Sequence, residues 1–228
     1  MIKAIIFDID NTLMDFIRLK RMAVESAILG MIGAGFHIDK DKSIEDIMQI
    51  YEEDGWEDQL VFNKFIENEL GHLDYKYLAS GILGYRKARE SALSPYPFVT
   101  STLIQILKKG IKLAIVSDAP SREAWLRLVQ LNLHNFFDVV ITFNDTNERK
   151  PSPKPFLLAL EKLDLQANET MMVGDWPERD IVGAKSVGIK TVYAKYGDIN
   201  PTNNSNADYD INSIDEILPI LDKENKNA

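Results

Sequence analysis

The sequence contains no cysteine, which excludes disulfide bonds, thiolate nucleophiles and thiolate metal ligands. It is also short of positive charge, with 26 Lys and Arg against 35 Asp and Glu and a formal net charge of −9. Phosphate backbones and anionic lipids repel an acidic surface, so we expect neither nucleic acid nor a membrane as a partner. A small phosphorylated metabolite stays open as a partner, because the charge near a site can differ from the net charge.

Long apolar runs are missing as well. No run approaches the ~18 residues that span a bilayer. No positively charged leader with a cleavage site precedes the first apolar segment, so a cytoplasmic location is the default expectation. Hydrophobic residues make up 45% of the 228 residues, which is typical of a globular chain.

Short apolar runs alternate with amphipathic stretches in the second half of the chain. This alternation predicts an α/β fold with a doubly wound, parallel, Rossmann-like sheet. We expect strands at 2–7, 112–116, 139–143, 170–173, 190–194 and 209–211. We expect helices at 100–109, 121–131, 153–163, 178–187 and 214–221, the last of them kinked or shortened by Pro219.

The segment between Asp15 and Ser94 breaks this rhythm, because it holds no good strand. Its four helical patterns cover 16–29, 44–53, 57–70 and 75–91. A parallel crossover usually needs a single helix, so the segment is predicted to be an inserted helical cap. The expected organisation is an α/β core formed by residues 1–14 and 95–222, a helical cap at 15–94 and a polar tail at 223–228.

Two aspartates, Asp8 and Asp10, follow the first apolar run directly. Carboxylates at the end of a buried strand repel each other and lose solvation. A fold tolerates such a pair most readily where a cation or a reaction requires it. The pair therefore favours Mg²⁺ and a nucleophilic carboxylate, and hence phosphoryl transfer.

Further polar residues follow other predicted strands or precede a helix. Ser117 and Asp118 end the run at 112–116, Lys150 precedes a proline-rich helix start, and Asp175 ends the run at 170–173 with Asp180 five residues later. The carboxyl ends of parallel strands share one edge of a sheet, where the ligand crevice lies. These side chains are thus expected to meet Asp8 and Asp10.

This ordered set resembles the motifs of the haloacid dehalogenase-like (HAD) hydrolase superfamily. The segment Asp8–Thr12 is similar to its DxDxT motif, and Gly174–Asp180 is similar to its GDxxxxD motif. Between them stand the hydroxyl of Ser117 and the amine of Lys150, in the order that the family uses. The segment 15–94 matches the place of the family's helical cap.

The resemblance implies a Mg²⁺-dependent phosphatase that acts on a small phosphate monoester. Asp8 is expected to attack phosphorus, and Asp10 to act first as general acid and then as general base. Lys150 is expected to offset the charge of the phosphate. The implied metal ligands are Asp8, the carbonyl of Asp10, and Asp175, with Asp180 holding metal-bound water or orienting Lys150. The implied phosphate-binding residues are Thr12, Ser117, Asp118 and Lys150.

Other activities stay open on the same fold. A dehalogenase has no need of Asp10, because halide leaves without protonation. A phosphonatase needs a cap lysine that forms a Schiff base, and a phosphomutase differs mainly in how its cap excludes water. A non-enzymatic binding protein is least expected, since a pure binder does not require Asp10.

We expect the cap to determine substrate specificity, but the sequence does not distinguish substrate-binding residues in the cap from solvated or packing residues. The charged and aromatic candidates are Arg18, Lys20, Trp56, Arg86 and Lys87. Each of these residue types is more often a solvated or packing residue than a ligand. Both a monomer and a homodimer are compatible with the sequence.

Overall fold

Six strands form one parallel sheet in the computed structural model, which describes residues 1–199, 202 and 204–226. The strands are β1 (Ala4–Phe7), β2 (Lys112–Val116), β3 (Val139–Ile141), β4 (Thr170–Gly174), β5 (Lys190–Ala194) and β6 (Tyr209–Ile211). Their order across the sheet is β3-β2-β1-β4-β5-β6. The doubly wound α/β fold predicted from the sequence is confirmed.

The order of the strands reverses beside β1. The chain passes from β1 to β2 and β3 on one side, then returns to β4, β5 and β6 on the other side. Phe7, the last residue of β1, lies opposite Ile115 of β2 and Val173 of β4. Ligand crevices of open α/β sheets lie outside the carboxyl ends of strands at such a reversal.

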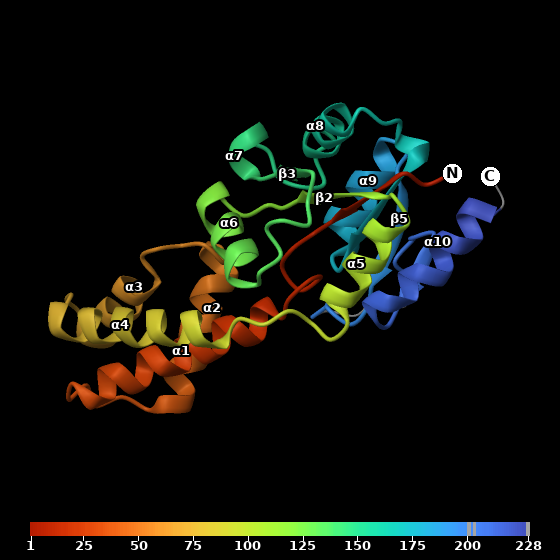
Figure 1. The fold of residues 1–228 in the computed structure, drawn as a ribbon. Helices are drawn as coiled ribbons and strands as arrows, with labels where there is room; N and C mark the ends of the chain where they lie inside the picture. The colour runs from red at the N-terminus through yellow and green to blue at the C-terminus, as the bar shows by residue number, and fades with distance from the viewer. Residues whose placement is uncertain (200–201, 203, 227–228) are drawn as a thin grey trace. The chain divides into compact units, whose positions relative to one another are not determined.

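Helices cover both faces of the sheet (Figure 1). They are α5 (Val99–Lys108), α6 (Ser121–Gln130), α7 (Phe143–Thr146), α8 (Lys154–Leu163), α9 (Val182–Ser186) and α10 (Ile217–Lys226). Alternate strand residues such as Ala4 and Ile6 pack with Phe156 of α8 and Ala184 of α9, as the two-residue period of a strand requires. On the other side, α5 contacts β2 and α10.

Several local expectations differ from the structure. The predicted strand at 139–143 ends at Ile141, because Thr142 caps α7 through Asp145. The predicted helix at 178–187 is divided into a π-helical turn at Pro177–Ile181 and the short α9.

The expected polar tail is a further difference, since α10 continues to Lys226. Glu224 holds this last turn to the sheet by pairing with Lys190 and the hydroxyl of Tyr209. Pro219 fits because it lies in the first turn of α10, where its missing N–H costs no helical hydrogen bond. Asn227 and Ala228, the end of the predicted tail, lie outside the described residues.

The chain divides into two units, Met1–Asp15 with Ser94–Ala228 and Phe16–Leu93. We call them the α/β unit and the helical unit. The helical unit holds α1 (Phe16–Gly33), α2 (Lys40–Asp54), α3 (Val61–Leu70) and α4 (Tyr75–Ala92). None of the helices in the described part of the chain is both long and apolar enough to cross a membrane.

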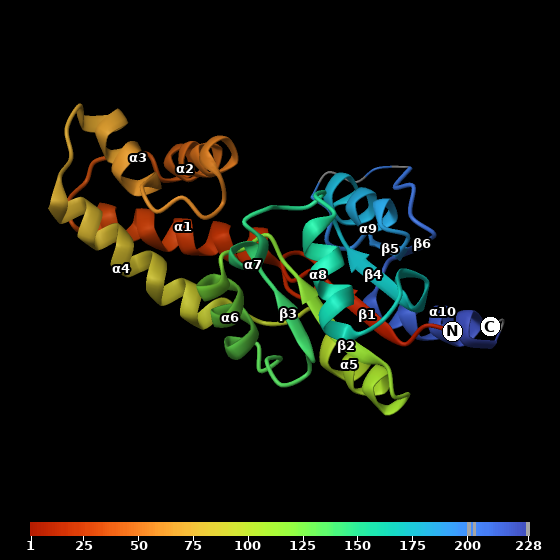
Figure 2. The ribbon, with the colours of Figure 1, turned by 90° about the horizontal axis from the view of Figure 1, so that it is seen from above.

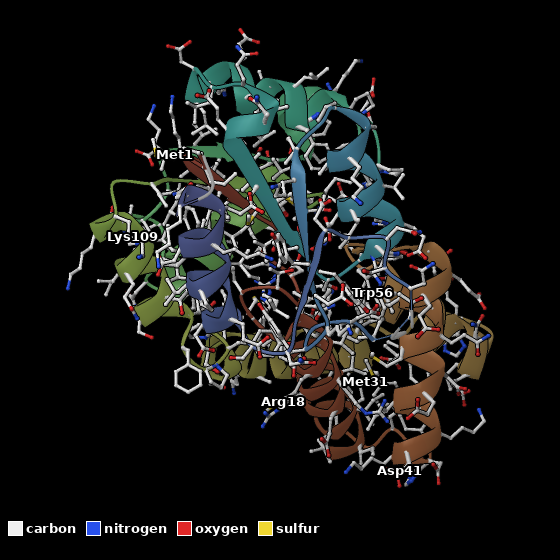
Figure 3. The ribbon with its side chains drawn as sticks, turned by 90° about the vertical axis from the view of Figure 1, so that its right-hand side faces the viewer. Met1, Arg18, Met31, Asp41, Trp56 and Lys109 are labelled. Carbon is white, nitrogen blue, oxygen red and sulfur yellow. The ribbon has the colours of Figure 1, made fainter. Side chains whose placement is uncertain are left out.

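Helices α1 and α4 pack lengthwise against each other (Figure 2). Glycines permit this approach, because a Cβ built at Gly84 would lie 2.3 Å from the carbonyl oxygen of Ser26. Apolar side chains of all four helices form a separate core, to which Met31 and Trp56, labelled in Figure 3, belong. Helix α2 begins earlier than expected, because Asp39 caps it by accepting a hydrogen bond from the Lys42 N–H at 2.8 Å.

Candidate active site

Three aspartates meet at the carboxyl edge of β1 and β4. The backbone N–H of Asp8 donates to the carbonyl of Val173 at 3.0 Å, which sets Asp8 beside the end of β4. One carboxylate oxygen from each of Asp8, Asp175 and Asp180 lies within 4.8 Å of the others. All three residues are buried, with Asp180 only 1% exposed. The structure thus brings together residues that the sequence separates by up to 172 positions.

Lys150 lies between two of these carboxylates. Its Nζ is 2.6 Å from Oδ1 of Asp8 and 2.6 Å from Oδ1 of Asp180. The neighbouring cations, Arg149 and Lys154, are exposed, and Lys154 pairs with Glu148 at the surface. Lys150 is therefore the cation of this segment that serves the buried aspartates.

Burial and mutual repulsion shape the charge of this cluster. Burial raises the pKa of Asp8 to about 8, with Asp180 and Asp10 adding to the rise and Lys150 opposing it. Burial, followed by the charges of Asp180 and Asp8, raises the pKa of Asp175 well above its usual value. Burial would lower the pKa of Lys150, but Asp180, Asp8 and Asp118 outweigh it and raise that pKa above its ordinary value. Without a further cation, the cluster is thus reluctant to ionise fully.

The donor set fits a divalent cation. Three carboxylates oppose the single ammonium of Lys150, an excess of two negative charges that a divalent ion would balance. Carboxylate oxygens are the ligands that Mg²⁺ and Ca²⁺ prefer. Among the described residues, this is the only group of three or more acidic or histidine side chains close enough to share an ion.

Thr12, expected to bind phosphate, contacts a carboxylate of the cluster through its side chain. It is fully buried, and its hydroxyl donates to Oδ1 of Asp175 at 2.9 Å. The hydroxyl proton is thus committed to a carboxylate instead of a phosphate oxygen. The role that this geometry supports is the orientation of Asp175.

Ser117 and Asp118, which follow β2, make different hydrogen bonds. Oγ of Ser117 accepts a hydrogen bond from the Ala119 N–H at 3.2 Å, an arrangement that leaves the hydroxyl proton to donate to a ligand. Asp118, expected at the phosphate, instead accepts from the Lys150 backbone N–H at 2.8 Å and from Arg179 at 3.2 Å. Both carboxylate oxygens of Asp118 thus accept hydrogen bonds from the protein itself. The side chain anchors the segment that carries Lys150.

The close packing of β4 and the π-helical turn places Asp180. A Cβ built at Gly174 would lie 2.3 Å from Cγ of Asp180, so only a glycine fits there without displacement. Oδ2 of Asp180 accepts from the Trp176 N–H at 3.0 Å. The ring of Trp176 itself is 40% exposed and stacks on Arg179, whose Cζ lies 3.8 Å from the ring centroid.

A tight turn after Asp8 carries Asp10 and Thr12. Asn11 has a φ of +57°, a left-handed conformation that asparagine adopts more readily than most residues. The hydroxyl of Tyr196 donates to the Thr12 carbonyl at 2.8 Å. A Cβ at Gly197 would lie 1.6 Å from the Asn11 carbonyl oxygen, which requires glycine at that position. The segment after β5 therefore braces the turn.

Sequence reasoning missed Arg127. This residue of α6 is 7% exposed, and its Nη1 donates to Oδ2 of Asp10 at 2.7 Å. No local motif identifies it, because 117 residues separate the pair. Asp8 and Asp10 are thus paired with different cations, Lys150 and Arg127.

The cap candidates divide into two groups. Arg18, Arg86 and Lys87 are exposed. Lys20 and Trp56 contact each other inside the helical unit, where Nζ of Lys20 donates to the Trp56 carbonyl at 2.5 Å. The same ammonium lies 4.1 Å from the centroid of the Tyr51 ring.

Comparison with known sequences relates this chain to a family of hydrolases and to proteins named as phosphatases. Residues 5–194 match the family model described as haloacid dehalogenase-like hydrolase. A protein of Methanocaldococcus jannaschii named glyceraldehyde 3-phosphate phosphatase is 34% identical over 224 residues, which cover 97% of each chain.

Two solved structures share this architecture. A HAD phosphatase from Thermococcus onnurineus is 32% identical with a TM-score of 0.68, and the match covers 96% of this chain and 98% of that one. A protein from Thermotoga maritima, provisionally described as a β-phosphoglucomutase, has a TM-score of 0.77 at 25% identity, with coverage of 97% and 99%.

Proposed function

The chain belongs to the haloacid dehalogenase-like hydrolases and is an enzyme of their phosphatase type; from this premise we propose that it hydrolyses a small phosphate monoester with Mg²⁺, through an aspartyl phosphate on Asp8. The observation that carries the proposal is the buried cluster of Asp8, Asp175 and Asp180 around the ammonium of Lys150. A carboxylate at a site prepared for cations is suited to attack an anionic phosphate.

The first half-reaction transfers the phosphoryl group to the protein. A carboxylate oxygen of Asp8 forms a bond to phosphorus while the bond from phosphorus to the leaving oxygen breaks. Asp10 gives its proton to that oxygen, so the product leaves as an alcohol. Ser117 donates a hydrogen bond to a phosphoryl oxygen, and Lys150 offsets the negative charge that gathers at the site.

The second half-reaction restores the enzyme. Asp10, now ionised, takes a proton from a water molecule whose oxygen bonds to phosphorus. The bond between phosphorus and the Asp8 oxygen breaks, which releases orthophosphate and the free carboxylate. One residue thus serves as acid and base in turn.

The residues that would hold Mg²⁺ are Asp8, Asp175 and the main-chain carbonyl of Asp10. Asp180 lies close enough to share the site or to hold one of its waters, and it also orients Lys150. When bound, the ion would supply the positive charge that brings an anionic nucleophile and an anionic substrate together. Thr12 would keep Asp175 in the orientation that the ion needs.

A small sugar or triose phosphate is the substrate class that we propose. The support comes from the relative named glyceraldehyde 3-phosphate phosphatase, which matches 97% of this chain. We propose that the helical unit selects the alcohol part of the substrate, while the α/β unit supplies the phosphate chemistry.

A panel of phosphorylated metabolites, assayed with Mg²⁺ and with excess chelator, tests the proposal. We expect phosphate release from triose phosphates with Mg²⁺, no release in chelator, and recovery when Mg²⁺ is restored. Isomerisation without release would instead favour a phosphomutase. Undiminished release in chelator, or full activity of Asp8→Asn, would overturn the mechanism.

A further inference from the structure

Helix α6 buries a charge and exposes apolar side chains. Its interior stripe consists of Ala124, Arg127 and Leu128, in which Arg127 and Leu128 lie three and four residues after Ala124, as one face of a helix requires. On the exposed side it carries Trp125 and Leu126, each 44% exposed. Desolvation strongly disfavours an arginine in the buried stripe of a helix unless the guanidinium is paired with an opposite charge.

The partner of this buried arginine is Asp10. The Nη1–Oδ2 distance is 2.7 Å, and the Arg127 side chain is 9% exposed against 24% for that of Asp10. A planar guanidinium holds a carboxylate in a defined orientation better than the point charge of a lysine. Arg127 therefore orients the Asp10 carboxylate from α6, the helix that follows β2.

Asp8 and Asp10 stand two residues apart and repel each other, since the charge of Asp10 contributes to the raised pKa of Asp8. Each carboxylate pairs with its own cation, Asp8 with Lys150 and Asp10 with Arg127. A general acid works only within hydrogen-bond reach of the oxygen that it protonates, so its orientation bears directly on the rate.

We propose that Arg127 is the positioning residue of Asp10, which it holds in the orientation needed for proton transfer to the leaving group. The inference rests on the proposed function, in which Asp10 is the acid and base. The proposal predicts that loss of Arg127 affects one step of the reaction selectively. Loss of Arg127 harms the proton-transfer role of Asp10 and leaves the attack by Asp8 and the Mg²⁺ site intact.

Leaving-group dependence separates this role from a merely structural one. We expect Arg127→Met to lower kcat for an alkyl phosphate about 10- to 100-fold more than for p-nitrophenyl phosphate, which needs little protonation. This is less than the about 10²- to 10⁴-fold expected for complete loss of general acid catalysis, because Asp10 itself remains. Arg127→Lys is expected to recover part of that loss. Arg122→Met, on the exposed face of the same helix, is the matched control and should leave both rates unchanged.

A double-mutant cycle adds a second readout. If Arg127 acts through Asp10, then Arg127→Met should cost little further kcat in an Asp10→Asn background, because residues acting as one unit are not additive. Melting temperature and Mg²⁺ affinity are measured on each variant to confirm folding and an intact metal site.

The outcomes distinguish the two proposals. Equal losses for both substrates in Arg127→Met, or full additivity with Asp10→Asn, would overturn the role of Arg127. Absence of any leaving-group dependence in Asp10→Asn itself would instead overturn Asp10 as the acid. If Arg127→Met does not fold, Arg127→Lys decides the question, since a loss confined to the alkyl phosphate supports positioning and an equal loss contradicts it.

Discussion

At the residue scale, most carboxylates of the site are compensated by a cationic side chain. Lys150 stands between Asp8 and Asp180, Arg127 holds Asp10, and Arg179 holds Asp118. Asp175 differs, since its carboxylate accepts a hydrogen bond from the neutral hydroxyl of Thr12. The positive charge of the proposed metal ion would therefore be most needed at Asp175.

The first prediction concerns Lys150. Replacing it with Met removes the ammonium that neutralises Asp8 and Asp180, so we expect kcat to fall about 10²- to 10³-fold, the usual loss for one preorganised charge-stabilising donor. Lys154→Met is the matched control, because that side chain is 61% exposed and pairs only at the surface. Steady-state kinetics with a triose phosphate measures both, and equal effects of the two substitutions would contradict the role of Lys150.

Motif order and spacing in the sequence predict the site residues Asp8, Asp10, Ser117, Lys150, Asp175 and Asp180. The structure places Asp8, Asp175, Asp180 and Lys150 together. The contacts of Thr12 and Asp118 could not be predicted from the sequence. The hydrogen-bond partner of a hydroxyl or carboxylate depends on which groups the tertiary structure brings close to it. Arg127 was missed for a similar reason. An arginine in an amphipathic helix ordinarily lies at the surface, and only the tertiary structure shows that this one turns inward.

At the element scale, the connection after β4 does most to place the acidic cluster. The strand ends in Gly174, and the π-helical turn Pro177–Ile181 returns Asp180 against it. Such turns occur frequently at functional sites. The sequence predicted an uninterrupted helix here, because a π-helical turn has no composition that distinguishes it from an α-helical start.

The second prediction follows from this packing. Gly174→Ala introduces a Cβ that would lie 2.3 Å from Cγ of Asp180, so the turn must shift and carry Asp180 away from Lys150. We expect Mg²⁺ affinity to fall about 10- to 100-fold, the usual effect of disturbing groups around a metal site. Titration calorimetry measures the affinity. Gly33→Ala, which has open space around it, is the control, and unchanged affinity in Gly174→Ala would refute the packing account.

The elements themselves were largely predictable. Apolar runs gave all six strands, and the absence of strand patterns between Asp15 and Ser94 separated the helical unit. The failures have local causes. Thr142 and Asp145 form a capping box that ends a strand early, and Glu224 gives a polar segment two partners that stabilise a last helical turn.

At the scale of the whole molecule, burial of the carboxylates is expected to couple stability to pH and to the proposed metal. In the metal-free protein the pKa of Asp8 is raised to about 8 from 3.8, so the folded protein keeps a proton that the unfolded chain releases. A raised carboxyl pKa of this kind makes unfolding easier as pH rises through that interval. The proposed binding of Mg²⁺ at these carboxylates would displace the proton and balance the charge.

The third prediction is therefore that Mg²⁺ raises the melting temperature more at about pH 8 than at about pH 6, while the metal-free protein melts lower at the higher pH. Thermal unfolding at both values, with Mg²⁺ and with chelator, measures the difference. Asp8→Asn is the control and should reduce the pH dependence. A Mg²⁺ effect independent of pH would contradict this coupling.

The fourth prediction concerns the division into two units. Exchanging Asp15–Ser94 for the corresponding segment of a relative with a different measured substrate preference should change the ranking of substrates and retain Mg²⁺ dependence. The reason is that all residues proposed for the phosphate chemistry belong to the α/β unit. An unchanged ranking in a folded, active chimaera would remove the specificity role of the helical unit.

The central claim, attack by Asp8 on phosphorus, is tested most directly by trapping the covalent intermediate. The enzyme is mixed with a turnover substrate and Mg²⁺, quenched in acid during steady state, digested and analysed by mass spectrometry. We predict one added phosphoryl group on the peptide that contains Asp8, and none on that peptide from Asp8→Asn or from enzyme in chelator. A phosphoryl group on another residue, or rapid phosphate release with no trapped species under any quench time, would contradict the account.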